Sequence, residues 1–193
     1  MKLKYPLILA SNSPRRQQLL RDLGIHFTII TQSIEEVFPS DIALNKIPEF
    51  LAKQKAEAFK ELSTNEMLLT ADTIVTLQNK ILGKPQSEKH AALMLSDLSG
   101  KTHQVYTGVC LRLHNNFHTF TECTDVLFRS LSKDEIEYYI KHYMPLDKAG
   151  SYGIQEWIGM IGIEKIIGSY FNVVGLPVAR VYDLFNKLDL IIW

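Results

Sequence analysis

The stretch LILASNSPRRQQLLRDLG, from Leu7 to Gly24, predicts a buried strand that leads directly into a helix. Its apolar start is typical of a strand covered on both faces. Ser13 is a favoured residue for capping a helix N-terminus, and Pro14 suits the first helical position. Gly24 suits the position just past the helix. Strand followed by helix is the unit of parallel α/β folds, so this stretch indicates the fold class.

Two arginines, Arg15 and Arg16, stand in the first turn of this expected helix. A helix N-terminus carries partial positive charge and unpaired N–H groups, so acidic residues are favoured there. An anion bound at this terminus explains the arginines, because guanidinium groups grip phosphate oxygens bidentately and Ser11 adds a hydroxyl donor. The alternative is that both arginines extend into solvent and Ser13 only caps the helix.

The remaining pattern predicts a mixed α/β fold. Further strands are expected over residues 26–30, 67–77 and 81–82 and over a hairpin of residues 104–131, with helices over 48–62, from 87 to before 100, after 132–135 and from about 177. Strand–helix units come first and the antiparallel hairpin later. We therefore expect one domain of residues 1–193, with a mixed twisted sheet, flanking helices and two lobes around a central cleft.

Composition excludes several classes of protein. The chain has 193 residues and a formal net charge of zero, which argues against a dedicated DNA or RNA binder. Cys110 and Cys123 form no C-x-x-C pair, so neither a zinc site nor a disulfide framework is predicted. No apolar run approaches the roughly 20 residues of a membrane span, and the basic N-terminus lacks a signal-length apolar region. These features predict a soluble cytoplasmic protein with reduced thiols.

Charged residues interrupt two apolar patterns. Lys55 falls on the apolar stripe of its expected helix, between Leu51 and Phe59. It either extends its ammonium to solvent or reaches a bound phosphate. Asp72 interrupts a strongly apolar strand, where an unpaired carboxylate is expensive. It is expected at a strand end or bulge, paired with a cation or bound to a metal.

Two further charged residues extend this set. Lys84 follows a tight turn in the segment ILGKP, and Glu36 stands in an acidic loop. Glu36 and Asp72 together supply the oxygen ligands that a hard divalent ion prefers. Taken alone, each acid is more typical of a surface charge or a structural pair. The combination of four cations, two acids and a helix terminus favours a polyphosphate site.

Two polar residues remain open in their interpretation. Gln155 follows the glycine-bearing segment DKAGSYG and can pair with a base edge, although a plain connecting loop explains the same residues. His103 precedes the long strand. A solvent-facing histidine is expected there, with a polar contact as the alternative. The histidines do not form a metal-binding pattern.

Six motifs in order, LASNSPRRQQLL, ADTIV, LGKP, HQVYTGV, DKAGSYGIQ and GSYFNVVGLP, resemble the Maf family of nucleoside triphosphate pyrophosphatases. The resemblance covers nearly the whole chain, from Leu9 to about Pro177. It implies hydrolysis of the α–β phosphoanhydride bond of a nucleoside triphosphate, giving the monophosphate and pyrophosphate, with Mg²⁺ or Mn²⁺. The departures, Ile74 and Phe171, are mild and touch no expected catalytic group.

The resemblance also assigns roles. Asp72 is the expected proton acceptor, and Glu36 and Asp72 are the expected metal ligands. Phosphate-binding residues are expected at Ser11, Arg15, Arg16, Lys55 and Lys84. Arg15, Thr73 and Gln155 match the branch that acts on dTTP and UTP rather than on methylated guanine nucleotides. A homodimer is allowed by the same resemblance.

Two other functions remain open. One is a pyrophosphatase for noncanonical purine triphosphates, which uses related chemistry. The other is a nucleotide-binding regulator of cell division without enzymatic activity. A carboxylate embedded among cations favours an enzyme, because binding a nucleotide alone does not need it.

Overall fold

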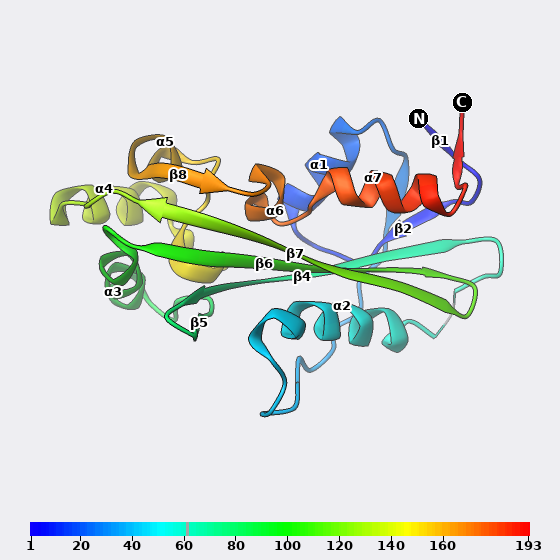
Figure 1. Cartoon of the computed structure of the whole chain (residues 1–193), viewed down its shortest axis with the longest axis horizontal. Helices are drawn as coiled ribbons and strands as arrows, with labels where there is room; N and C mark the ends of the chain where they lie inside the picture. The colour runs from blue at the N-terminus through cyan, green and yellow to red at the C-terminus, as the bar shows by residue number, and fades with distance from the viewer. Residues whose placement is uncertain (61) are drawn as a thin grey trace. The chain divides into compact units, whose positions relative to one another are not determined.

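The computed structural model describes residues 1–60 and 62–193, which form two compact units. Unit 1 comprises Met1–Asp72, Thr107–Glu122 and Gly175–Trp193, and unit 2 comprises Thr73–Tyr106 and Cys123–Val174. Three long strands, β4 (Met67–Leu77), β6 (Thr102–Leu113) and β7 (Asn116–Phe128), contribute residues to both units (Figure 1). Three of the four crossings between the units therefore lie inside regular strands, and the fourth lies between Val174 and Gly175, after α6 (Tyr170–Val174).

Unit 1 begins with the predicted strand and helix. Strand β2 (Leu7–Leu9) pairs in parallel with both β3 (Phe27–Ile29) and β4. Helix α1 (Pro14–Asp22) starts after Ser13, whose hydroxyl accepts the Arg16 backbone N–H. The chain leaves the helix through Gly24, whose φ of +69° favours glycine. The predicted strand–helix unit and the mixed sheet are confirmed.

Helix α2 (Ile47–Ala58), preceded by a 3₁₀ turn η1 (Leu44–Lys46), ends before the predicted limit at Leu62. The side chain of Arg112 explains the early end. Its guanidinium donates to the carbonyls of Ala56 at 3.1 Å and Phe59 at 2.5 Å. These last-turn carbonyls have no partner within a helix, so an arginine that caps them favours termination there. Glu61, inside the predicted helix, lies outside the described residues.

Helix α2 lies very close to strand β6. A Cβ atom on Gly108 would stand 2.1 Å from the backbone nitrogen of Glu49 and 2.1 Å from the carbonyl carbon of Pro48. Only glycine permits this contact. The Glu49 carboxylate fixes the same helix by accepting the hydroxyls of Thr119 at 2.7 Å and Thr121 at 3.1 Å. Helix α2, which carries Lys55, is therefore held firmly against the sheet.

The remaining elements of unit 1 lie at the chain ends. Helix α7 (Val178–Lys187) follows Pro177 and buries Val178, Val181 and Phe185. Strand β9 (Ile191–Ile192) pairs antiparallel with β1 (Lys2–Leu3). The predicted start of the last helix at about residue 177 is thus confirmed.

Unit 2 places helices beside the other halves of the long strands. Strand β5 (Lys80–Leu82) returns antiparallel to β4 through a turn with positive φ at Gln78 and Asn79. Its other elements, in chain order, are α3 (Glu88–Leu98), α4 (Lys133–Tyr143), η2 (Pro145–Asp147), η3 (Ala149–Ser151), α5 (Trp157–Gly162), β8 (Ile163–Ile167) and α6 (Tyr170–Val174). A capping box opens α4 at the predicted place, with Ser132 and Glu135 satisfying each other's backbone N–H groups.

The interior of unit 2 corrects one prediction from the sequence. His103 is completely buried rather than solvent-facing. Its Nε2 lies 2.7 Å from the Tyr152 hydroxyl, and its ring stacks on Phe128. The alternation of β6 contained the signal, because His103 shares a strand face with Val105 and Thr107, which are also buried.

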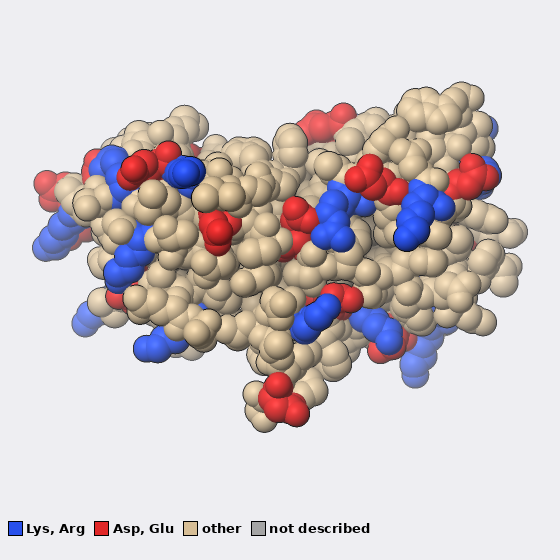
Figure 2. Space-filling model, in the orientation of Figure 1, with Lys and Arg blue, Asp and Glu red and all other residues tan. Residues whose placement is uncertain are grey.

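On the face drawn in Figure 2, basic and acidic side chains are interspersed rather than gathered into one field. Both cysteines are free thiols, as predicted. None of the helices in the described ranges is long and apolar enough to cross a membrane.

Candidate active site

Arg16, in the first turn of helix α1, connects this helix to the backbone of Ala71 and Gly175. The guanidinium donates from Nε to the Gly175 carbonyl at 2.8 Å and from Nη1 to the Ala71 carbonyl at 2.9 Å. Nη1 also lies 3.4 Å from Ser11 Oγ, which in turn accepts the Ser13 backbone N–H. Arg16 therefore fixes the start of helix α1 to Ala71, the residue before Asp72.

This finding refines the expectation that both arginines face a phosphate. The bonds to Gly175 and Ala71 give the Arg16 guanidinium a structural role, and its contact with a phosphate stays a prediction. Burial and the neighbouring Arg15 lower the pKa of Arg16, while Asp72 and Glu36 oppose that effect. Burial is the largest of these influences. Arg15, Arg16, Asp72 and Glu36 are thus close enough to interact electrostatically.

The second part of the site is an ion cluster around Lys55. Its Nζ lies 2.6 Å from Asp72 Oδ1 and 2.8 Å from Glu36 Oε1. The side chains of Lys55 and Asp72 are 19% and 13% exposed, whereas Glu36 is 51% exposed. The interpretation that Lys55 extends into solvent is therefore wrong. The Lys55 ammonium contacts both carboxylates, and that of Glu36 remains accessible to solvent.

The arrangement in unit 1 combines cationic groups, a hydroxyl and two carboxylates. The Asp72 carboxylate is mostly buried and pairs with the Lys55 ammonium. A carboxylate fixed in this way can serve as a proton acceptor. Ser11 is buried beside Arg16, so its hydroxyl is fixed rather than solvated. The structure brings together five of the predicted residues, namely Ser11, Arg16, Glu36, Lys55 and Asp72, and Arg15 precedes Arg16 in the first turn of α1.

The other predicted residues belong to unit 2. Thr73 follows Asp72 directly in β4 and is half-buried. Lys84 is exposed just after β5, next to Gly83, whose carbonyl accepts the Gly150 N–H at 3.2 Å. Gln155 is half-buried in the connection between η3 and α5. Within unit 2, the segments that carry Lys84 and Gln155 are therefore joined by a backbone hydrogen bond.

Glu36 and Asp72 have the donor chemistry that a divalent metal requires. Both are oxygen donors and both contact Lys55, so they are close enough to share one small cation. No group of three or more Asp, Glu, His or Cys side chains that could hold a metal gathers anywhere in the described part of the chain, so Glu36 and Asp72 would be its only two such ligands there. Two carboxylates suit Mg²⁺, which commonly takes its remaining ligands from water and substrate phosphates.

Sequence reasoning missed several residues around these sites. Gly175 contributes only a carbonyl to Arg16, and a backbone contact of this kind leaves no signal in residue type. Lys148, inside the quoted segment DKAGSYGIQ, is buried and pairs with Glu156 at 3.1 Å. A lysine in a glycine-rich segment looks solvated, and only tertiary packing shows otherwise.

Comparisons with known proteins agree with the predicted family. Residues 6–188 match the family described as Maf-like protein. A dTTP/UTP pyrophosphatase of Phocaeicola vulgatus is 52% identical over 187 residues, which cover 96% of this chain and 97% of that protein. Proteins of the same name from Bacteroides thetaiotaomicron and Flavobacterium johnsoniae are each 48% identical, covering 96% of this chain and 97% and 96% of their own lengths.

Proposed function

The chain belongs to the Maf family, and from that premise we propose that it is a nucleoside triphosphate pyrophosphatase acting on dTTP and UTP. It cleaves the α–β phosphoanhydride bond and releases a nucleoside monophosphate and pyrophosphate. The relatives named dTTP/UTP pyrophosphatase support this activity, since they match over nearly their full length. Within this proposal, residues 1–193 act as one domain.

The observation that carries the proposal is the contact of Lys55 with both Asp72 and Glu36, beside the buried guanidinium of Arg16. Hydrolysis requires a water molecule, a base to take its proton and positive charge to offset that of the phosphates. Asp72 takes the proton from the attacking water. Lys55 holds that carboxylate in place and limits its repulsion of the substrate.

The phosphate chain is bound by hydroxyl and cationic donors. Ser11, Arg15 and Arg16 supply them at the start of α1, where backbone N–H groups also favour an anion. Lys84 adds a further cation to the same set. Arginine suits this role because its planar fork matches two phosphate oxygens, while lysine acts as a point charge.

A divalent metal, Mg²⁺ or Mn²⁺, belongs to the proposal, with Glu36 and Asp72 as its protein ligands. Bound there, it would supply charge neutralisation on the phosphate oxygens and lower the pKa of a bound water. The remaining ligands come from water and phosphates, since the protein offers two carboxylates.

Substrate choice is assigned to Arg15, Thr73 and Gln155, the residues that match the dTTP and UTP branch. The Gln155 amide has both a donor and an acceptor, so it can read the edge of a pyrimidine. A cytoplasmic location fits the same proposal, because free thiols such as Cys110 and Cys123 are typical of reducing compartments.

A panel of nucleoside triphosphates tests the proposal. The purified chain is incubated with dTTP, UTP, CTP, dATP, GTP, ITP and XTP, each with Mg²⁺, Mn²⁺ or no metal. Pyrophosphate and orthophosphate are measured separately. We expect pyrophosphate from dTTP and UTP, in a metal-dependent reaction, with little orthophosphate.

The rival functions give different results in the same panel. Release of pyrophosphate from ITP and XTP alone would replace the pyrimidine assignment with the purine one. Nucleotide binding without any product, with either metal, would favour a regulatory protein. Orthophosphate as the first product would show cleavage at the terminal phosphate and would contradict the α–β assignment.

A further inference from the structure

A buried network in unit 2 surrounds the segment that carries Gln155. The Lys148 ammonium, 8% exposed, lies 3.1 Å from Glu156 Oε1 and 2.7 Å from Asp147 Oδ1. The hydroxyl of Tyr139, a fully buried residue of α4, donates to Glu156 Oε2. The same hydroxyl accepts the Gly153 backbone N–H at 3.1 Å. Three side chains thus fix both sides of Gln155 along the chain.

Burying this network has a desolvation cost in free energy. A buried ammonium and a largely buried carboxylate lose hydration, and a well-packed apolar pair of similar size is often equally stable. Burial and the bond to Glu156 raise the pKa of Tyr139, so its hydroxyl remains a donor. Fully paired polar networks restrict the conformations of the segments they join.

The backbone of the segment is restricted at the same place. A Cβ on Gly153 would lie 2.8 Å from Glu156 Cδ and 3.0 Å from Gln155 Nε2, so both side chains fold back over this glycine. A Cβ on Gly159, in α5, would lie 1.9 Å from the Ile154 carbonyl oxygen. Helix α5 therefore packs directly on the segment and leaves it little freedom.

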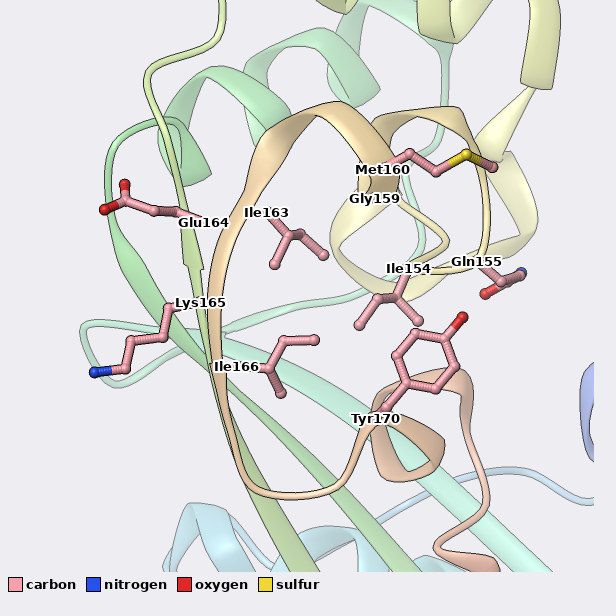
Figure 3. A pocket seen from close by; sticks show the side chains of 9 residues that line it. All are labelled: Ile154, Gln155, Gly159, Met160, Ile163, Glu164, Lys165, Ile166 and Tyr170. Atoms are coloured by element: carbon pink, nitrogen blue, oxygen red, sulfur yellow. The ribbon is translucent and has the colours of Figure 1, made fainter.

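Gln155 lies beside a pocket of unit 2. Its Oε1 is buried and has no hydrogen-bond partner among the described residues. Gln155 lines an apolar pocket of about 470 Å³ with Ile154, Met160 and Tyr170. In Figure 3 the amide and the Tyr170 hydroxyl lie near each other at one end of this pocket. A buried acceptor without a donor is expensive, so a ligand N–H would relieve that cost.

We propose that Tyr139, Glu156 and Lys148 are positioning residues that fix the Gln155 amide and thereby set selection of uracil and thymine over cytosine. The inference rests on the proposed function. Uracil and thymine present an N–H between two carbonyl groups, whereas cytosine presents an acceptor nitrogen beside an amino group. An amide that rotates freely can serve either pattern. An amide held with Oε1 opposite the ring nitrogen accepts the N–H of uracil or thymine, whereas in cytosine it would face the lone pair of that nitrogen.

Replacing Tyr139 by phenylalanine tests this role. Tyr139→Phe keeps the buried ring but removes the bonds to Glu156 and Gly153. We expect the ratio of kcat/KM for UTP to that for CTP to fall about tenfold, the usual value of one buried hydrogen bond of about 1.4 kcal/mol. The change should appear in KM for UTP, with kcat within about twofold.

The controls separate positioning from general damage. Tyr143→Phe removes a phenol from the same helix at an exposed position and should leave the UTP to CTP ratio unchanged. Inorganic triphosphate, which lacks a base, should inhibit Tyr139→Phe and the unmodified chain with equal inhibition constants. If Tyr139→Phe does not fold, Glu156→Gln carries the same measurements, because it weakens the pair with Lys148 while keeping side-chain size.

Each outcome decides one question. A chain that shows no pyrimidine turnover at all refutes the proposed function. A selective chain whose Tyr139→Phe and Glu156→Gln variants keep the UTP to CTP ratio within twofold overturns the positioning role alone. Equal losses with every nucleotide, together with weaker inhibition by inorganic triphosphate, also overturn it, because they indicate a structural role without selectivity.

Discussion

Replacing Asp72 by asparagine separates chemistry from binding at the proposed site. Asparagine has the same shape as aspartate and keeps an acceptor oxygen for the Lys55 ammonium, now 2.6 Å from Asp72 Oδ1. It cannot accept a proton from water near neutral pH. The Asp72→Asn variant should therefore bind nucleotide and fail to hydrolyse it.

The size of each effect follows from the contacts. Loss of a general base lowers a rate by about 10²–10⁴-fold. This corresponds to about 3–5 kcal/mol of transition-state stabilisation. The stability cost should stay below the about 3–5 kcal/mol of breaking a buried ion pair. Glu36, 2.8 Å from the same ammonium, keeps Lys55 paired after the substitution.

Two measurements test this reasoning. Steady-state pyrophosphate release from dTTP gives kcat, and calorimetric titration with an α,β-imido analogue of dTTP in the absence of metal gives the dissociation constant. We expect kcat to fall by at least 100-fold. The analogue should bind at least as tightly as to the unmodified chain, because one negative charge near the phosphates has been removed.

Asp125→Asn provides a matched control on a different strand. Asp125, in β7, accepts the Gln104 side chain at 3.0 Å and is half-buried. The same chemical change there should leave kcat near its original value. If Asp72→Asn turns over dTTP within about tenfold of the unmodified chain, Asp72 is not the base and the mechanism is wrong.

Three further predictions concern packing, protonation and metal. Gly108→Ala should destabilise the fold by about 1–3 kcal/mol or more, because the added Cβ would lie 2.1 Å from the backbone of α2. Gly83→Ala is the control: no atom lies within 4 Å of the added carbon, so its thermal unfolding should be nearly unchanged. Burial lowers the pKa of His103 to about 4. Between pH 6.5 and pH 4 this histidine is therefore protonated in the unfolded chain and neutral in the folded chain. Stability should therefore fall by up to about 3 kcal/mol as the pH drops through that range, and His103→Gln should flatten the dependence of the unfolding temperature on pH. Treatment with EDTA should stop pyrophosphate release and added Mg²⁺ or Mn²⁺ should restore it; full activity after chelation would contradict the metal role.

Much of the site was readable from the sequence because each residue broke a local rule. Arg15 and Arg16 oppose the helix dipole, Lys55 interrupts an apolar stripe, and Asp72 interrupts a buried strand. Such conflicts are expected where function outweighs local preference. The structure shows that Lys55 resolves its conflict by pairing with Asp72 and Glu36.

Residues whose role depends on a distant partner gave no such signal. Gly108 looks like any strand glycine until α2 is placed against it, and Tyr139 looks like an ordinary core aromatic until its hydroxyl meets Glu156. The end of α2 also escaped prediction, because the cap comes from Arg112, more than 50 residues away. Non-local contacts override helix propensity without leaving a local pattern.

The sequence by itself determined the family, the parallel strand–helix start and the charged residues of the proposed site, because periodicity, caps and misplaced charges are local properties of a chain. Only the tertiary structure decided which charges pair, that Arg16 donates to the backbone carbonyls of Gly175 and Ala71, and that His103 and Lys148 are buried. Burial and pairing depend on segments far apart in the chain, and their free energies are fixed only when those segments meet.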